Sequence, residues 1–145
     1  MLNGPRLADF IGKWIISREI EDRMASEALI FSGRVSYEPD DAGLTYREEG
    51  LLRPPGRPAM QAERRYLWRA SGDDIEVRFE DERFFHTIPK GVYATATHDC
   101  VPDRYNVIYD FRSWPQWHSV WEVSGPRKDY RMLSMYRPER QSRWL

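Results

Sequence analysis

Several ionisable and aromatic side chains recur at every second position of segments in which apolar and polar residues alternate. They stand on the more apolar face of each segment, where a charge or a ring nitrogen is costly to bury unless it meets a partner. The candidate site residues on these faces are Arg18, Glu48, Arg64, Tyr66, His86, His98, Tyr105, Tyr109, Trp121 and Tyr130. Small residues on the same faces, namely Gly33, Ala94, Ala96 and Ser119, leave room beside them. We therefore predict an internal or mouth-facing pocket with polar and aromatic walls.

The residue types of this pocket favour a small, partly apolar ligand that carries an anionic or carbonyl group. Arg18 and Arg64 present fork-shaped donors suited to a carboxylate or a phosphate, and the tyrosines of the set add hydroxyl donors. If Glu48 neutralises one arginine, a neutral polar ligand fits equally well. The alternative is a filled core, in which Arg18 and Glu48 only tie strands together and the tyrosine hydroxyls find partners inside.

The histidines leave two further hypotheses open. His86 or His98 could hold a haem or a metal, because His98 and Cys100 lie two residues apart and so share one face of a strand. Two histidines and one cysteine are a sparse set for zinc, however. Alternatively, His86 or His98 could be the acid–base group of a barrel isomerase, cyclase or hydrolase, oriented by Asp103 or Tyr105. The sequence contains no nucleophile motif and no glycine-rich phosphate loop, and we predict no metal and no cofactor.

Short strands must position these residues. Alternating patterns broken by turn residues predict strands at about 13–23, 27–37, 44–50, 60–69, 75–79, 84–88, 92–100, 105–111, 117–123 and 130–136. Helical periodicity is absent beyond a short apolar turn that contains Leu7, Phe10 and Ile11. Since short connections make sequential strands pair, we expect an all-β fold: one antiparallel barrel of about 8–10 strands, closed on itself, with the N-terminal turn as its floor.

Composition fits a single domain over residues 1–145. The 22 basic and 23 acidic residues are interspersed, which argues against a nucleic-acid partner. The single cysteine, Cys100, excludes an internal disulfide and suits a reducing compartment. We find neither a signal peptide at residues 1–6 nor an apolar run long enough to span a bilayer. We therefore expect a cytoplasmic protein with a small-molecule ligand and no membrane partner, of undetermined oligomeric state.

The opening of the first strand, Gly12-Lys13-Trp14, resembles the start of the calycins, the superfamily of the lipocalins and the fatty-acid-binding proteins. Only residues 24–26 separate the first two predicted strands, whereas the fatty-acid-binding proteins place a helical lid there. The lipocalin-like barrel is therefore the better match. The resemblance also implies that an arginine near the last strand, Arg127 or Arg137, stacks across Trp14 and closes the floor.

Motifs in the C-terminal half resemble an uncharacterised bacterial and fungal family of lipocalin-like domains. These motifs are Phe85-His86, His98-Asp99-Cys100, Asp103-Arg104-Tyr105, Tyr109-Asp110-Phe111 and the run from Trp121 to Tyr130. With Gly12-Lys13-Trp14, the likeness spans nearly the whole chain and implies a calycin-type barrel without an assigned activity. Some ten-stranded calycins resembling nitrobindin hold haem through one histidine, but the glycine-rich opening of nitrobindin is missing here.

Overall fold

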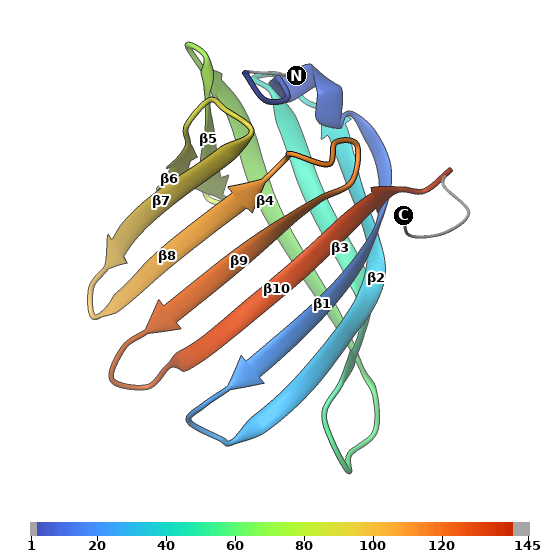
Figure 1. Ribbon diagram of the computed structural model, residues 1–145, viewed down its shortest axis with the longest axis vertical. Coiled ribbons are helices and arrows are strands. Elements are labelled where there is room, and N and C mark those ends of the chain that lie inside the picture. The colour runs from blue at the N-terminus through green and yellow to red at the C-terminus, as the bar shows by residue number, and fades with distance from the viewer. Residues whose placement is uncertain (1–2, 141–145) are drawn as a thin grey trace.

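Strands form where apolar and polar residues alternate, because a strand directs successive side chains to opposite faces of a sheet. The computed structural model describes residues 3–140 (Figure 1). Its elements are the 3₁₀ turn η1 (Leu7–Phe10) and the strands β1 (Gly12–Asp22), β2 (Glu27–Pro39), β3 (Leu44–Arg53), β4 (Met60–Ser71), β5 (Asp74–Phe79), β6 (Phe84–Ile88), β7 (Tyr93–Cys100), β8 (Asp103–Asp110), β9 (Trp117–Ser124) and β10 (Asp129–Pro138). This confirms the predicted all-β barrel with a short N-terminal turn. Within residues 3–140, no helix has the length and apolar character needed to cross a membrane.

The strands pair in the order β6-β5-β4-β3-β2-β1-β10-β9-β8-β7. Sequential neighbours therefore pair as predicted, with the exception of β6 and β7, which are the two edges of the sheet. The first and last strands pair instead, from Trp14 opposite Pro138 to Asp22 opposite Tyr130. As the sheet curls, β6 and β7 come to lie side by side without a hydrogen-bonded ladder (Figure 1). The expectation of a fully closed barrel was wrong, because the barrel has a seam between β6 and β7.

The two ends of the barrel differ (Figure 1). At one end, which we call the floor, η1 lies across the opening and places the Phe10 ring in the core, fully buried. The indole Nε1 of Trp14 donates a hydrogen bond to the backbone oxygen of Phe10 at 2.9 Å, which fixes the turn to β1. At the other end, which we call the hairpin end, lie the turns β1–β2, β3–β4, β7–β8 and β9–β10 (Figure 1). The turn η1 therefore covers the floor, whereas hairpin turns form the opposite end.

Neither arginine expected to stack across Trp14 shares both its end and its face of the barrel. Arg127 belongs to the β9–β10 turn, at the opposite end of the barrel from Trp14. Arg137 pairs with Ile15 in the β1–β10 ladder, so it stands on the outer face of the sheet while Trp14 points inward. The Trp14 ring instead packs against aromatic neighbours, with its centroid 5.5 Å from that of Trp114. Aromatic packing therefore closes the floor.

A β-bulge in β6 changes the predicted alternation there. Val77 pairs with His86, but the next residue, Arg78, pairs with Phe84, so Phe85 is an extra residue without a partner on β5. A bulge of this kind turns one additional side chain toward the same face. As a result Phe85 and His86 are both buried, whereas Phe84 is 46% exposed. Strict alternation over the predicted strand 84–88 would put Phe84 on the same inward face as His86, and the bulge overturns this expectation.

Gly33 and Gly50 face each other where β2 and β3 approach closely. A Cβ atom added to Gly33 would lie 2.2 Å from the backbone oxygen of Glu49, and one added to Gly50 would lie 2.2 Å from that of Ser32. Both glycines are therefore required by the strand packing. The prediction that Gly33 leaves room for a ligand was wrong.

Candidate functional site

A buried ion pair spans the middle of the barrel. Two nitrogens of the Arg18 guanidinium donate to the two carboxylate oxygens of Glu48, at 2.6 and 2.9 Å. The Arg18 Nε donates to the hydroxyl of Ser134 at 2.7 Å, and the Tyr46 hydroxyl donates to Glu48 Oε1 at 2.5 Å. Burial alone would raise the pKa of Glu48, but the Arg18 guanidinium outweighs burial and holds this pKa below its ordinary value. Glu48 is therefore ionised and has little capacity left for a further positive partner.

Arg64 is a second cation beside this pair. It stands directly opposite Glu48 in the β3–β4 ladder, on the inward face. No carboxylate of residues 3–140 forms an ion pair with it, and its guanidinium contacts two neutral partners, the hydroxyl of Tyr66 and the weak acceptor Sδ of Met132, the latter at 4.0 Å. Burial opposes its charge, but the Tyr66 phenol and the Glu48 carboxylate outweigh burial and keep its pKa above the ordinary value. Arg64 is therefore a permanent, partly buried cation without a carboxylate of its own.

A small cavity lies between these groups. Its volume is about 20 Å³, and a cavity needs about 10–15 Å³ on the same measure to hold one water molecule. The predicted site residues on its wall are Arg18, Glu48, Arg64, Tyr66, Tyr109 and Trp121. The interior of the barrel is thus mostly filled by side chains, with room for one or two atoms at its polar centre.

The other predicted site residues lie away from this cavity. His98 lies at the seam, in edge-to-face contact with Phe85 at a centroid distance of 5.4 Å. Tyr105 and Tyr130 are partly exposed near the hairpin end. There the Lys128 Nζ lies 3.4 Å from the Tyr105 hydroxyl. These three residues share the inward face with the cavity wall but stand closer to the hairpin end or the seam.

His86 is buried behind the cavity wall. Its Nε2 is hydrogen-bonded to the hydroxyl of Tyr109 at 2.8 Å, and its Nδ1 has no hydrogen-bond partner within the described chain. Burial, with a smaller contribution from the charge of His98, lowers the pKa of His86 to about 3. His86 is therefore neutral, and its bonded nitrogen is unavailable to a metal or a substrate. Residues 3–140 contain no group of three histidine, cysteine or carboxylate side chains placed to hold a metal ion.

We predict that His86 makes the folded state sensitive to mild acid. Its folded pKa of about 3 lies below the unfolded value of about 6.5. Between these two pH values His86 is protonated in the unfolded chain but neutral in the folded state. The free energy of unfolding therefore falls as the pH falls. The slope is up to about 1.4 kcal/mol per pH unit. Urea unfolding at about pH 7 and about pH 5, where histidines are the main groups that titrate, should show this loss.

The matched variants for this measurement are His86→Gln and His118→Gln. His118 lies on the outer face opposite Asp110, so His118→Gln should keep most of the pH slope. His86→Gln should lose it, whatever its effect on stability at neutral pH. Equal slopes in the two variants would contradict the assignment to His86.

The cavity wall also includes residues outside the predicted set of site residues, among them Ser119, which was expected only to leave room there. They are Tyr46, Trp68, Val77, Trp117, Ser119 and Tyr136. Each stands on the inward face of its strand, so the alternation that selected the other residues applies to them too. Alternation identifies the inward face, but it does not give the height along the barrel at which a side chain lies.

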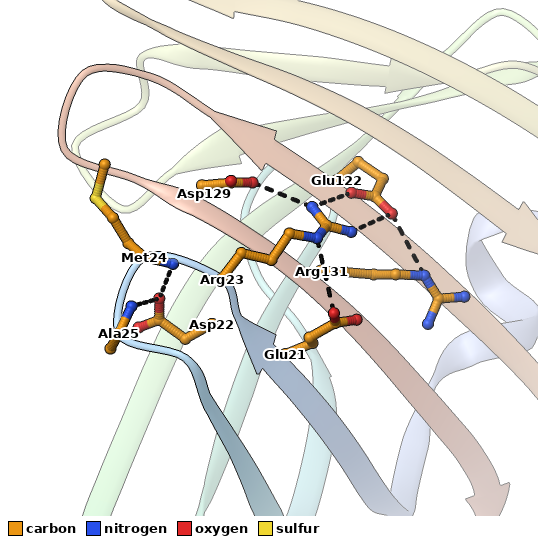
Figure 2. A network of polar contacts seen from close by, with 8 residues as sticks. All are labelled: Glu21, Asp22, Arg23, Met24, Ala25, Glu122, Asp129 and Arg131. Carbon is orange, nitrogen blue, oxygen red and sulfur yellow. Dashed lines mark hydrogen bonds and ion pairs between the residues drawn. The ribbon is translucent and has the colours of Figure 1, made fainter.

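A group of exposed charges at the hairpin end is paired around Arg23, in contrast to Arg64. The Arg23 guanidinium donates to Glu122 at 3.0 and 3.3 Å and to Asp129 at 3.1 Å (Figure 2). The carboxylate of Asp22 accepts hydrogen bonds from two backbone N–H groups of the following turn, both at 3.1 Å (Figure 2). These contacts hold the β1–β2 turn against β9 and β10. Because the groups are exposed, they position the rim and contribute little to stability.

Comparisons with known proteins agree with this architecture. A family model described as "Family of unknown function (DUF6314)" matches residues 10–138. No curated protein matches the chain by sequence. Among solved structures, the S-type phycobiliprotein lyase CPES from Guillardia theta is similar, with a TM-score of 0.53 and 10% sequence identity. The alignment covers 94% of this chain and 92% of that chain. At this identity the similarity concerns the barrel fold.

Proposed function

Because the chain belongs to the DUF6314 family of unknown function, we propose its function from the barrel interior: it binds a small molecule with one anionic or carbonyl group. In this proposal Arg64 binds that group, and the rings of Tyr66 and Trp121 contact the apolar part of the ligand. The ligand therefore binds at the inner wall of the barrel, next to the Arg18–Glu48 pair.

The observation that carries this proposal is the imbalance of charge around the cavity. Arg18 and Arg64 bring two positive charges to its wall, and Glu48 is the one carboxylate among the described residues that line it. Arg18 already engages both oxygens of Glu48. A guanidinium withdrawn from water without a full partner is unfavourable, so Arg64 favours an acceptor from outside the protein. Its planar fork suits a carboxylate or phosphate in particular.

The burial of inward-facing residues indicates the route of entry. At the floor, Phe10 and Trp14 are 0% and 4% exposed. Toward the hairpin end, the inward residues Leu52, Tyr105 and Tyr130 are partly exposed. We therefore place the entrance at the hairpin end, with Tyr105 and Tyr130 on its wall.

The size of the cavity limits how the ligand can bind. About 20 Å³ accepts a single oxygen atom or water, so the larger part of the ligand must lie toward the hairpin end. The side chains of Arg64, Tyr66 and Trp121 are only partly buried. In our proposal these side chains turn outward to admit the ligand, and the network around Arg18 stays fixed.

The fold gives general support to a binding function. A barrel of similar shape occurs in a phycobiliprotein lyase. Because one fold hosts many functions, this similarity does not identify the ligand. The choice of an anionic ligand rests on Arg64.

We predict that Arg64→Met weakens the binding of anionic apolar dyes. The probe is 8-anilinonaphthalene-1-sulfonate, and its uncharged counterpart is N-phenyl-1-naphthylamine, which lacks the sulfonate. A hydrogen bond to a charged group contributes about 1.5–3 kcal/mol, so the wild type should bind the sulfonate about 10- to 100-fold more tightly than Arg64→Met. Affinity for the uncharged dye should change little. Fluorescence titration measures both dyes.

The control variant is Arg65→Met. Arg65 is adjacent in sequence but lies on the outer face, where it pairs with Glu63. Its replacement should leave the affinity for both dyes near the wild-type value. If Arg65→Met and Arg64→Met weaken sulfonate binding alike, or if the wild type does not distinguish the two dyes, the proposed role of Arg64 is wrong.

A further inference from the structure

Two indole N–H groups inside the barrel have no acceptor. Trp68 and Trp117 are each 3% exposed, and both line the central cavity. Within residues 3–140, the Nε1 of neither indole has a hydrogen-bond partner. A buried donor left without a partner destabilises the folded state, and native proteins rarely contain one. Two such donors on the wall of one cavity therefore indicate a site for an acceptor.

Stacking holds both indoles in place. The Trp117 ring stacks on Tyr136 with centroids 3.8 Å apart and planes at 7°. The Trp68 ring lies parallel to Tyr46, with centroids 6.1 Å apart and planes at 13°. The hydroxyls of these two tyrosines are hydrogen-bonded to each other at 3.0 Å. The two indoles thus flank a fixed pair of phenols and have little freedom to turn toward other acceptors.

The one carboxylate of the cavity wall among the described residues is already engaged. Arg18 binds both carboxylate oxygens of Glu48, and the Tyr46 hydroxyl also donates to Oε1. An indole can only donate, so it cannot satisfy another donor. What the cavity lacks is therefore an acceptor atom from outside the protein.

We propose that the cavity is a binding site for one uncharged acceptor oxygen, with the indoles of Trp68 and Trp117 as donors. The oxygen belongs to a water molecule or to a carbonyl or ether group at the inner end of the ligand. The volume of about 20 Å³ admits one such atom. The charges of Arg18 and Glu48 neutralise each other, so the inner oxygen is uncharged, whereas the remaining charge of Arg64 binds the anionic group of the ligand. The case in which this oxygen belongs to a ligand rests on the proposed function.

This site also narrows the class of ligand. Arg64 lines the same cavity, so the anionic group that it binds and the inner oxygen are separated by only a few atoms. The ligand class is thus a short keto acid or a related compound, with an apolar part directed toward the hairpin end.

The first test is an NMR measurement on the protein labelled with ¹⁵N. The indole N–H signals of Trp68 and Trp117 are assigned by triple-resonance spectra, and their contacts with water are measured by rotating-frame Overhauser spectroscopy. Both indole protons should contact a bound water in the protein without added compounds. Trp14 is an internal control, because its indole already donates to the backbone oxygen of Phe10. Its proton should show no such contact.

The second test compares 4-oxopentanoate with pentanoate, which differ by the ketone oxygen. One additional hydrogen bond contributes about 0.5–1.5 kcal/mol, so 4-oxopentanoate should bind about 2- to 10-fold more tightly. It should also displace the water contact and shift both indole signals, which pentanoate should not do. In Trp117→Phe the two compounds should bind with more similar affinity.

The outcomes separate this inference from the proposed function. If neither indole proton contacts water and neither signal responds to 4-oxopentanoate, the acceptor site is wrong, even if Arg64 binds the sulfonate dye. If both indole protons contact water but neither 4-oxopentanoate nor the sulfonate dye binds, the acceptor site is supported with water as its occupant, and the proposed function fails. Binding of 4-oxopentanoate in place of the water supports both.

Discussion

Replacing Glu48 with leucine is expected to destabilise the protein by about 3–5 kcal/mol, the usual result of removing one partner of a buried ion pair. Glu48 is 2% exposed, and its carboxylate is the counter-charge of Arg18 inside the barrel. Without it, two guanidinium groups remain on the cavity wall with no anion. The free energy of unfolding, obtained from urea titration at neutral pH, measures the effect.

Two further variants make this result interpretable. Glu49→Leu changes the next residue, which lies on the outer face and pairs with Arg47, and its stability should stay near that of the wild type. The double variant Arg18→Met with Glu48→Leu should recover most of the lost stability, because apolar replacement of both partners of a buried pair is often neutral. A Glu48→Leu variant as stable as Glu49→Leu would contradict the buried network. A double variant less stable than Glu48→Leu would show that Arg18 stabilises the fold through groups other than Glu48.

The alternation of residue types was sufficient to predict the strands. The first predicted strand, 13–23, and the second, 27–37, correspond to Gly12–Asp22 and Glu27–Pro39. Alternation works here because each strand has one face in the core and one in solvent. For the same reason Arg18 and Glu48 were correctly assigned to the interior, where both are buried.

The seam and the bulge could not be predicted in this way. Which strands meet when a sheet curls depends on its accumulated twist and on the strand lengths, and neither is a property of a local pattern. The bulge at Phe85 inserts one residue opposite β5, and no residue type in β6 marks the insertion. Strict alternation therefore assigns Phe84 to the wrong face.

The inward orientation of the predicted site residues followed from alternation, whereas their depth in the barrel did not. Arg64 and His98 share the inward face, but Arg64 lines the central cavity and His98 lies at the seam. Their positions along the barrel follow from the ladder registers, which bring Glu48 opposite Arg64 and His98 opposite Tyr105. The sequence alone does not contain these registers. The unpaired charge of Arg64 becomes visible only once the partner of Glu48 is known to be Arg18.

Replacing Trp14 with alanine is expected to destabilise the protein by about 3–5 kcal/mol, as truncation of a buried tryptophan generally does. The Trp14 ring is 4% exposed and packs against Phe10, Trp114 and Trp117 at the floor. Truncation removes these contacts and also the hydrogen bond from the indole to the backbone oxygen of Phe10. Two effects should therefore appear together. The free energy of unfolding falls, and the amide of Ile11, which donates to the backbone oxygen of Ala8 within η1, exchanges faster with deuterium.

Two variants separate packing from hydrogen bonding in this prediction. Trp14→Phe keeps an aromatic ring but removes the donor, so it should accelerate exchange in η1 while losing less stability than Trp14→Ala. Lys13→Ala alters the exposed neighbouring residue and should leave both measurements unchanged. If Trp14→Ala unfolds at the same urea concentration as Lys13→Ala, Trp14 is not the residue that anchors the floor. In that case the turn at Phe10 is held by the packing of the Phe10 ring on its other aromatic neighbours, such as Trp68 and Phe111.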